Sequence, residues 1–363
     1  MAEELRFGFI GAGEIAMQTA KAVADAAGAR LVAVTDANAD LAGDLAGRHG
    51  AEAVDSPDEL TGRDDVDAVY IAVPHFLHTV MAQTAARAGK HVLLEKPTGT
   101  SAEDAERTLR AARECGVTFS VPFIYRYTAA WQKIREIVAD GLLGDLQGLR
   151  IVYTAKKPSS YWQGGYSGRS KSDWRTRLLQ AGGGVLIMNC VHDIDAVRWA
   201  TGLDAERVFA EYGTFATPVE VEDYIAAVIS YRGGAVGVIE AGSNVPGGAG
   251  PMGNGGHRFI GTEGQIVLDA GRLWLFSEHG GFGVEAGKWG EVPAPQVREP
   301  RTLLIEDYAR SVLAGDQPPI PEDAGLEALK VISAAYQSRK AGRPVRIEEL
   351  FQKVVMAPRS TVG

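Results

Sequence analysis

The sequence predicts an α/β fold whose N-terminal part is a parallel sheet covered by helices on both faces. Three observations support this prediction. Short apolar runs alternate with helix-like segments, a glycine-rich turn follows the first run, and an acidic residue ends the second. Strands that alternate with helices form βαβ units, which are typical of parallel sheets.

Six apolar runs are the candidate strands of this sheet: 5–10, 30–36, 51–54, 68–73, 91–95 and 117–121. Alanine-rich segments with a charged face separate them and predict helices over 14–26, 38–48, 77–88 and 101–114. Six strands is the number in a complete dinucleotide-binding domain. We therefore predict a Rossmann domain over residues 1–122.

The first turn, GAGEIA at residues 11–16, has the pattern G-x-G-x-x-A between a strand and a helix. Gly11 permits the tight turn, and Gly13 lets the backbone approach a pyrophosphate at the helix N-terminus. The motif is weak by itself. A flavodoxin-like fold without a dinucleotide is the alternative.

Asp36 ends the second predicted strand, where a ribose-binding acid belongs. A carboxylate there accepts from both ribose hydroxyls and repels a 2′-phosphate. No arginine or lysine follows in residues 37–40. The sequence therefore favours NAD over NADP.

Two later strand ends also face the expected ligand crevice, because open α/β sheets bind ligands at the carboxyl ends of their strands. One is AVPHFLH at 72–78, and the other is LLEKP at 93–97. Lys96 is either a solvated cap or projects toward the nicotinamide, and the Lys96–Pro97 bond is a candidate for the cis form.

The stretch GGGVLIMNCVHDID, residues 182–195, places an imidazole and two carboxylates after an apolar run. In a regular α-helix Met188, His192 and Asp195 share one face. Asp195 would then hold the imidazole or bind a substrate hydroxyl, while Asp193 would be solvated or salt-bridged. His192 is either a buried structural histidine or a catalytic base.

A long polar loop, residues 156–180, precedes this stretch and mixes aromatic side chains with arginines and lysines. Loops of this length are usually functional or disordered. Aromatic rings and planar donors suit sugars. Tyr161, Trp174 and Arg175 are therefore candidate ligand contacts, with a mobile surface loop as the alternative.

Composition excludes several classes of protein. The 363 residues fit two domains better than one. A net charge of −9 argues against a nucleic-acid partner, and no apolar run is long enough to span a membrane. The two cysteines show no metal-ligand spacing, so we expect no metal site and a reducing, cytoplasmic setting.

Together, GAGEIA, Asp36, PHFLH, EKP and GGG…HxxD resemble the Gfo/Idh/MocA family of oxidoreductases, which includes glucose–fructose oxidoreductase and inositol dehydrogenase. The resemblance runs through the whole chain. It implies a second, α+β domain over residues 123–363, with a large and mostly antiparallel sheet for substrate binding and oligomerisation. The protein would be a homodimer or homotetramer.

The resemblance also implies an activity. Lys96 and His192 would be the catalytic pair of an NAD-dependent enzyme acting on a secondary alcohol or ketone of a sugar, an inositol-like polyol or a glycoside. The family usually has aspartate where this chain has Met188, and often glycine at Cys190. Two alternatives stay open: an NAD-dependent lyase or glycosidase that oxidises a sugar hydroxyl transiently, and a non-catalytic NAD-binding sensor.

The predicted site residues fall into three groups. For the cofactor they are Gly11, Ala12, Gly13, Glu14, Ile15, Asp36, Val73, Pro74, His78, Glu95, Lys96, Trp174 and Arg175. For a carbohydrate or polyol substrate they are Lys96, Tyr125, Arg126, Tyr161, Trp174, Asn189 and His192. For catalysis they are Lys96, His192 and Asp195.

Overall fold

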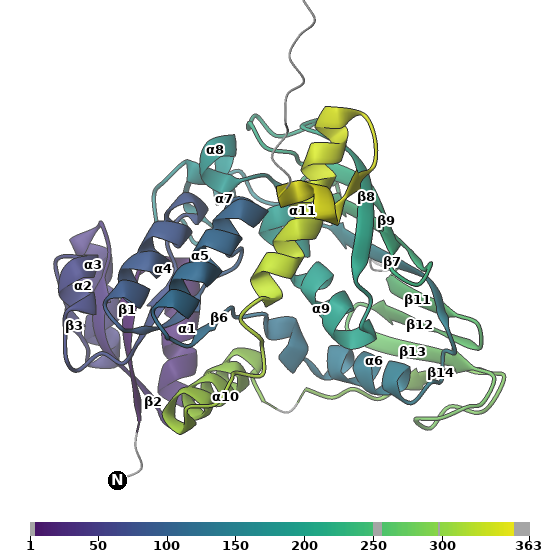
Figure 1. Cartoon of the computed structure of the whole chain (residues 1–363), viewed down its shortest axis with the longest axis horizontal. Helices are drawn as coiled ribbons and strands as arrows, with labels where there is room; N and C mark the ends of the chain where they lie inside the picture. The colour runs from purple at the N-terminus through teal and green to yellow at the C-terminus, as the bar shows by residue number, and fades with distance from the viewer. Residues whose placement is uncertain (1–3, 250–255, 297, 352–363) are drawn as a thin grey trace, which may run out of the picture.

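The computed structural model of the chain describes residues 4–249, 256–296 and 298–351. Two sheets lie side by side with helices packed between them (Figure 1). Both predicted parts of the fold are confirmed, because the N-terminal sheet is parallel and the second sheet is mostly antiparallel. None of the helices in the described ranges is long and apolar enough to cross a membrane.

The first sheet has the strand order β3-β2-β1-β4-β5-β6, in which every pair is parallel. Its strands are β1 (Leu5–Ile10), β2 (Ala29–Thr35), β3 (Glu52–Ala53), β4 (Ala68–Ile71), β5 (His91–Leu94) and β6 (Phe119–Ser120). The helices are α1 (Glu14–Asp25), α2 (Ala39–His49), α3 (Pro57–Thr61), α4 (His78–Arg87) and α5 (Ala102–Glu114). The order reverses at β1, where open sheets of this kind bind dinucleotides.

The second sheet has nine strands in the order β14-β13-β12-β11-β7-β10-β9-β8-β15. They are β7 (Leu146–Thr154), β8 (Ala205–Gly213), β9 (Tyr224–Tyr231), β10 (Val236–Gly242), β11 (His257–Gly261), β12 (Gly264–Asp269), β13 (Arg272–Ser277), β14 (Trp289–Val292) and β15 (Val345–Arg346). Only the β7–β10 pair is parallel among these described strands.

Helices cover one face of the second sheet. They are α6 (Ala129–Ala139), α9 (Val191–Thr201) and α11 (Ala324–Ala341), and all three lie toward the first sheet in Figure 1. On β9 and β10 buried and exposed residues alternate, as expected for strands with one covered face. The uncovered face carries Val228, Val236, Val238 and Ile260, each at least 38% exposed.

The C-terminal part of the chain returns to the first sheet. Helix α10 (Pro300–Ala314) packs on α1, and α11 packs on α5. Tyr308 of α10 lies against Phe7 of β1, with ring centroids 6.0 Å apart. The second half of the chain thus also covers the first sheet, and the boundary between 1–122 and 123–363 stays a prediction.

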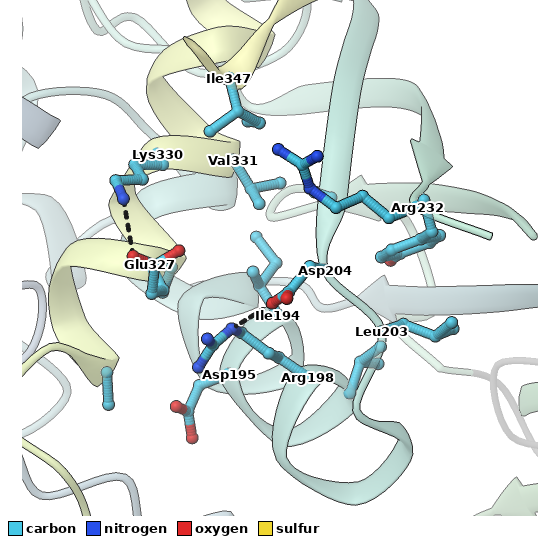
Figure 2. A pocket seen from close by; sticks show the side chains of 15 residues that line it. Ile194, Asp195, Arg198, Leu203, Asp204, Arg232, Glu327, Lys330, Val331 and Ile347 are labelled. Atoms are coloured by element: carbon cyan, nitrogen blue, oxygen red, sulfur yellow. Dashed lines mark hydrogen bonds and ion pairs between the residues drawn. The ribbon is translucent and has the colours of Figure 1, made fainter. Parts of the chain in front are cut away.

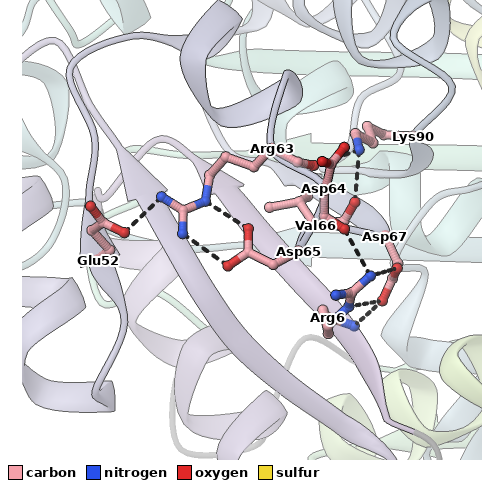
Figure 3. A network of polar contacts seen from close by, with 8 residues as sticks. All are labelled: Arg6, Glu52, Arg63, Asp64, Asp65, Val66, Asp67 and Lys90. Carbon is pink, nitrogen blue, oxygen red and sulfur yellow. Dashed lines mark hydrogen bonds and ion pairs between the residues drawn. The ribbon is translucent and has the colours of Figure 1, made fainter.

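A polar network fixes the loop that enters β4 (Figure 3). Arg6 binds both carboxylate oxygens of Asp67, and Arg63 binds both oxygens of Asp65. The Lys90 ammonium donates to the carbonyl oxygens of Arg63 and Val66. These contacts lie at the start of β4, opposite the carboxyl ends of the strands, so they support the sheet rather than the ligand site.

Candidate active site

A cleft of about 940 Å³ runs along the carboxyl ends of the first sheet and under the polar loop of the second domain. All predicted cofactor-binding residues except the buried Ala12 line it. Of the predicted substrate-binding residues, Lys96, Tyr161 and Trp174 also line it.

The phosphate turn has the geometry that its glycines predict. Gly11 has a φ of +100°, and a Cβ there would collide with the carbonyl oxygen of Ala72. The Ala12 amide donates to one oxygen of Asp36 (2.7 Å), and the Asn38 amide donates to the other (2.8 Å). The carboxylate is therefore held at the end of β2, and its remaining lone pairs can accept from ribose hydroxyls.

A segment of the polar loop crosses over this turn. The Glu14 side chain, at the start of α1, accepts from the amides of Tyr166 (2.9 Å) and Ser167 (3.1 Å). The Arg169 guanidinium donates to the Ala12 carbonyl (3.0 Å) and to Asp44 of α2 (2.7 Å). Sequence reasoning missed this strap, because nothing in residues 164–171 shows that they fold back onto a turn 150 residues earlier.

The ends of β4 and β5 meet beside Lys96, and the Lys96–Pro97 bond is cis. The buried His78 ring lies between two carbonyl oxygens, those of Val73 (2.8 Å) and Pro97 (2.6 Å). Trp174 packs on His75 with ring centroids 4.4 Å apart. The ligand-facing ends of both strands are thus held in place by buried imidazoles.

Glu95 lines the same cleft, but its carboxylate is engaged by groups beneath it. One oxygen accepts from Tyr70 (2.8 Å) and lies 3.3 Å from Arg301 of α10. The other accepts from the Lys96 amide at 3.1 Å. This buried pair ties the cleft floor to the returning C-terminal helix.

The stretch 182–195 begins with a close approach to the segment just before β9. A Cβ at Gly184 would collide with the Glu222 backbone, so this position requires glycine. Residues Leu186–Cys190 then form a π-helical turn, and α9 begins at Val191. The Lys96 ammonium donates to the carbonyl oxygen of Met188 at 3.0 Å. Such turns are frequent at functional sites.

His192 follows this turn and is half-buried. Its ring stacks on Tyr125 with centroids 5.0 Å apart and meets Phe123 edge-on at 5.9 Å. Nδ1 has no hydrogen-bond partner among the described residues. Burial lowers the pKa of His192 well below its ordinary value, and Lys96 and Arg301 lower it further. The ring is therefore neutral at neutral pH and can accept a proton.

The structure corrects the expectation for Asp195 and Arg126. Arg126 donates to both oxygens of the Asp195 carboxylate (2.9 and 2.6 Å), and both side chains are buried. Asp195 therefore does not hold the His192 ring, and neither residue lines the cleft. The physical reason is the buried Arg126 guanidinium, which engages both oxygens of this carboxylate and keeps it from the imidazole.

Asp195 instead lines a separate cavity of about 220 Å³ behind α9 (Figure 2). This cavity also contains the ion pairs Arg198–Asp204 and Glu327–Lys330. The sequence predicted that Asp193 is either solvated or salt-bridged. It forms a salt bridge and is buried. Its partner is His257, at 3.1 Å.

A second lysine lies next to the π-helical turn, and sequence reasoning missed it. The Lys157 ammonium donates to Asn189 Oδ1 (2.6 Å) and lies 4.2 Å from the centroid of the Tyr161 ring. Asn189 donates in turn to the Tyr153 hydroxyl at 2.9 Å. Lys157 is only 5% exposed. A lysine in a polar loop reads as a surface residue, so the sequence carried no signal for its burial.

The cleft fits NAD by the chemistry of its donors. One end offers the start of α1 and a strand-end carboxylate, which suit a pyrophosphate and a ribose. The other end offers Lys96, Trp174 and Arg175, which suit a nicotinamide ring and a reacting hydroxyl. His192 lies behind this lining, on the turn that binds Lys96.

Comparison with known proteins agrees with this geometry. Residues 5–123 match a family model described as "Oxidoreductase family, NAD-binding Rossmann fold", and residues 131–267 match the "GFO/IDH/MocA C-terminal domain". The chain is 33% identical over 233 residues to a 1,5-anhydro-D-fructose reductase of Ensifer adhaerens, covering 64% of this chain and 67% of that protein.

Two further similarities span nearly the whole chain. A myo-inositol 2-dehydrogenase of Thermotoga maritima is 26% identical over 356 residues, covering 96% of this chain and 100% of its own. The crystal structure of an aldose-aldose oxidoreductase from Caulobacter crescentus, complexed with glycerol, superposes with a TM-score of 0.81 at 24% identity. It covers 95% of this chain and 100% of its own, and it supports the fold.

Proposed function

Because the chain belongs to the Gfo/Idh/MocA family of NAD-binding oxidoreductases, we propose that it transfers a hydride between NAD and a secondary alcohol or ketone of a sugar, polyol or glycoside. Its relatives include a sugar reductase and an inositol dehydrogenase, which supports this substrate class.

One observation carries the proposal. The Lys96 ammonium is fixed on the turn that leads into His192, and His192 has a neutral ring whose buried Nδ1 has no hydrogen-bond partner among the described residues. A cation and a proton acceptor are therefore set close together at the carboxyl end of β5. This is the pair that oxidation of a carbinol requires.

Each residue then has a defined task. His192 takes the hydroxyl proton during oxidation and returns it during reduction. Lys96 stabilises the negative charge that develops on the same oxygen. Asn189, Tyr153 and Tyr161 offer polar groups to the remaining hydroxyls. NAD supplies the hydride acceptor when bound.

The test is a screen of sugars and polyols with NAD, following NADH absorbance. We expect at least one substrate to give steady turnover, with NADPH bound more weakly than NADH in a fluorescence titration. NADH that accumulates once per subunit and is then consumed without net turnover would point to the lyase or glycosidase instead. NAD binding without turnover across the screen would contradict an enzymatic role.

We also infer that the protein is a homo-oligomer that packs through the uncovered face of its second sheet. Val228 and Val238 are cross-strand partners on this face, and Val236 and Ile260 lie close by. Exposed apolar sheet faces of this size favour association. Light scattering should give the mass of a dimer or tetramer. Val238→Lys should lower it, and Val80→Lys, at an exposed valine of α4, should not.

We place the protein in a reducing compartment such as the cytoplasm. Cys115 is exposed and Cys190 is buried, and both are free thiols.

A further inference from the structure

Three cationic side chains surround Tyr161, and none of them forms an ion pair with a carboxylate among the described residues. The Lys96 ammonium is bound by a carbonyl oxygen, and the Lys157 ammonium by an amide oxygen. The Arg175 guanidinium lies 5.1 Å from the Tyr161 ring and 4.5 Å from the Trp174 ring. This corner of the cleft therefore carries an excess of positive charge.

The carboxylates near this corner are engaged elsewhere. Glu14 accepts from the amides of the strap, Glu95 lies on Arg301, and Asp193 pairs with His257. None of them neutralises the three cations. The protein as a whole is acidic, so the local excess is not a consequence of its composition.

Lys157 shows the imbalance most clearly. A buried ammonium is unfavourable unless an opposite charge and good hydrogen bonds compensate for its lost hydration. Its partners here are a neutral amide oxygen and the ring and hydroxyl of Tyr161, and none of these is a carboxylate. Burial lowers the pKa of Lys157, Tyr161 raises it in part, and Lys96 and Arg175 lower it further.

The pKa of the Tyr161 hydroxyl responds to the same positive charge. Burial acts to raise the pKa of its hydroxyl, but Lys157, Arg175 and Lys96 together bring that pKa below its ordinary value. Within the described part of the chain, this hydroxyl donates only to Met188 Sδ, a weak acceptor 3.8 Å away. Tyr161 is therefore available to donate to a ligand.

We propose that the substrate is a sugar acid whose carboxylate binds in the cleft beside Tyr161, where Lys157 and Arg175 supply the positive charge, while a ring hydroxyl meets Lys96 and His192. This inference rests on the proposed function and deepens it. A carboxylate supplies the counter-charge that this corner lacks. The neighbouring Tyr153 hydroxyl, which already accepts from Asn189, keeps its own proton free for a second hydrogen bond.

The test compares sugars that differ only in the charged group. D-Glucuronate is paired with D-glucose, and D-galacturonate with D-galactose. Binding to the NADH-loaded protein is measured by calorimetry, and kcat/KM is measured with NAD. We expect each acid to be favoured over its hexose on the order of 10- to 100-fold, as is typical of hydrogen bonds to a charged group.

Three variants locate the effect. Lys157→Met should remove the preference for the acids while leaving NADH affinity unchanged. Lys156→Met removes the same charge from the exposed neighbouring residue and should keep the preference. Met188→Asp, which places a carboxylate beside Tyr161, should lower affinity for the acids even if Lys157→Met folds poorly.

The outcomes separate this inference from the proposed function. Hexoses or polyols turned over with no preference for the acids would overturn the inference alone. Acids that bind through Lys157 without any turnover would support it and contradict the proposed function. Tighter binding of glucose 6-phosphate than of glucuronate would replace the carboxylate with a phosphate and overturn the sugar-acid class.

Discussion

The cofactor half of the cleft is formed mostly by main-chain groups, whereas the substrate half is formed mostly by side chains. The cofactor half is built mainly on main-chain groups and strand ends from the first hundred residues, such as the Ala12 amide and the Gly11 turn, with the strap over residues 164–171 packed on it. The substrate half uses side chains from four separate segments, namely Lys96, Tyr125, the 153–161 region and the turn leading to His192. A substitution removes a side chain but leaves a main-chain group in place.

The two halves should therefore respond differently to single substitutions. The cofactor half depends on the path of the backbone, so few single changes redirect it. The substrate half depends on which side chains meet, so a single change can alter its charge. The following experiments test this division, beginning with the largest effect.

Replacing His192 with alanine should remove turnover while leaving the cofactor half intact. We expect kcat to fall on the order of 10²- to 10⁴-fold, because general acid–base groups contribute about this much. NADH affinity, measured by fluorescence titration, should stay within a few-fold of wild type. Lys96→Ala should have a similar effect, with some loss of nicotinamide positioning. Turnover near the wild-type rate in His192→Ala would return this residue to a structural role.

Replacing Asp195 with alanine should destabilise the protein without imitating His192→Ala. Removing one partner of a buried ion pair typically costs about 3–5 kcal/mol, and here it leaves the Arg126 guanidinium buried and unpaired. Urea unfolding followed by tryptophan fluorescence measures the loss.

The double variant Arg126→Met with Asp195→Leu is the matched control and should recover much of this stability. A large loss of kcat in Asp195→Ala with normal stability would move this carboxylate back into the active site.

Replacing Asp36 with alanine should weaken the cofactor half, since this carboxylate is the main side-chain group there. NADH affinity should fall on the order of 10- to 100-fold, by the usual worth of hydrogen bonds to a charged group. The gap between NADH and NADPH should narrow. Asp40→Ala removes an acid from the same region but outside the cleft lining, and should change neither affinity. Equal binding of NADH and NADPH by the wild type would refute the role of Asp36.

The pH dependence of kcat/KM should reflect the protonation of His192 in the substrate half. Burial lowers the pKa of His192, so its neutral, proton-accepting form persists below the ordinary histidine value. The acid limb of kcat/KM for oxidation should therefore lie below about pH 6.5. His192 also binds its proton less readily folded than unfolded, so its contribution to stability falls as pH drops below that value. An acid limb at or above pH 6.5 would contradict a buried neutral base.

The sequence predicted the cofactor half well, because that half is local. The G-x-G-x-x-A turn, Asp36 and the alternation of strands and helices are patterns within short windows, and the structure has them where expected. Lys96 at the end of β5 followed from the same reasoning, since the edge of a parallel sheet fixes where strand ends meet.

The substrate half was predicted less well, because its geometry depends on contacts between distant segments. The pairing of Asp195 with Arg126 joins two segments far apart in the sequence, so the residue spacing within 182–195 does not show it. The burial of Lys157 and the strap through Arg169 follow from how the polar loop folds back. Neither the burial of Lys157 nor the strap can be predicted from the types of the residues involved.

The contact between Lys96 and position 188 has a consequence for how relatives of this chain can diverge. The lysine is anchored on the main-chain oxygen of Met188, not on its side chain. Mutation at this position can therefore change the polarity of the substrate corner and leave that anchor in place. A single substitution of Met188 by aspartate can therefore change the substrate preference of a relative. The hydrogen bond that positions Lys96 is kept throughout, because the main-chain oxygen remains in place.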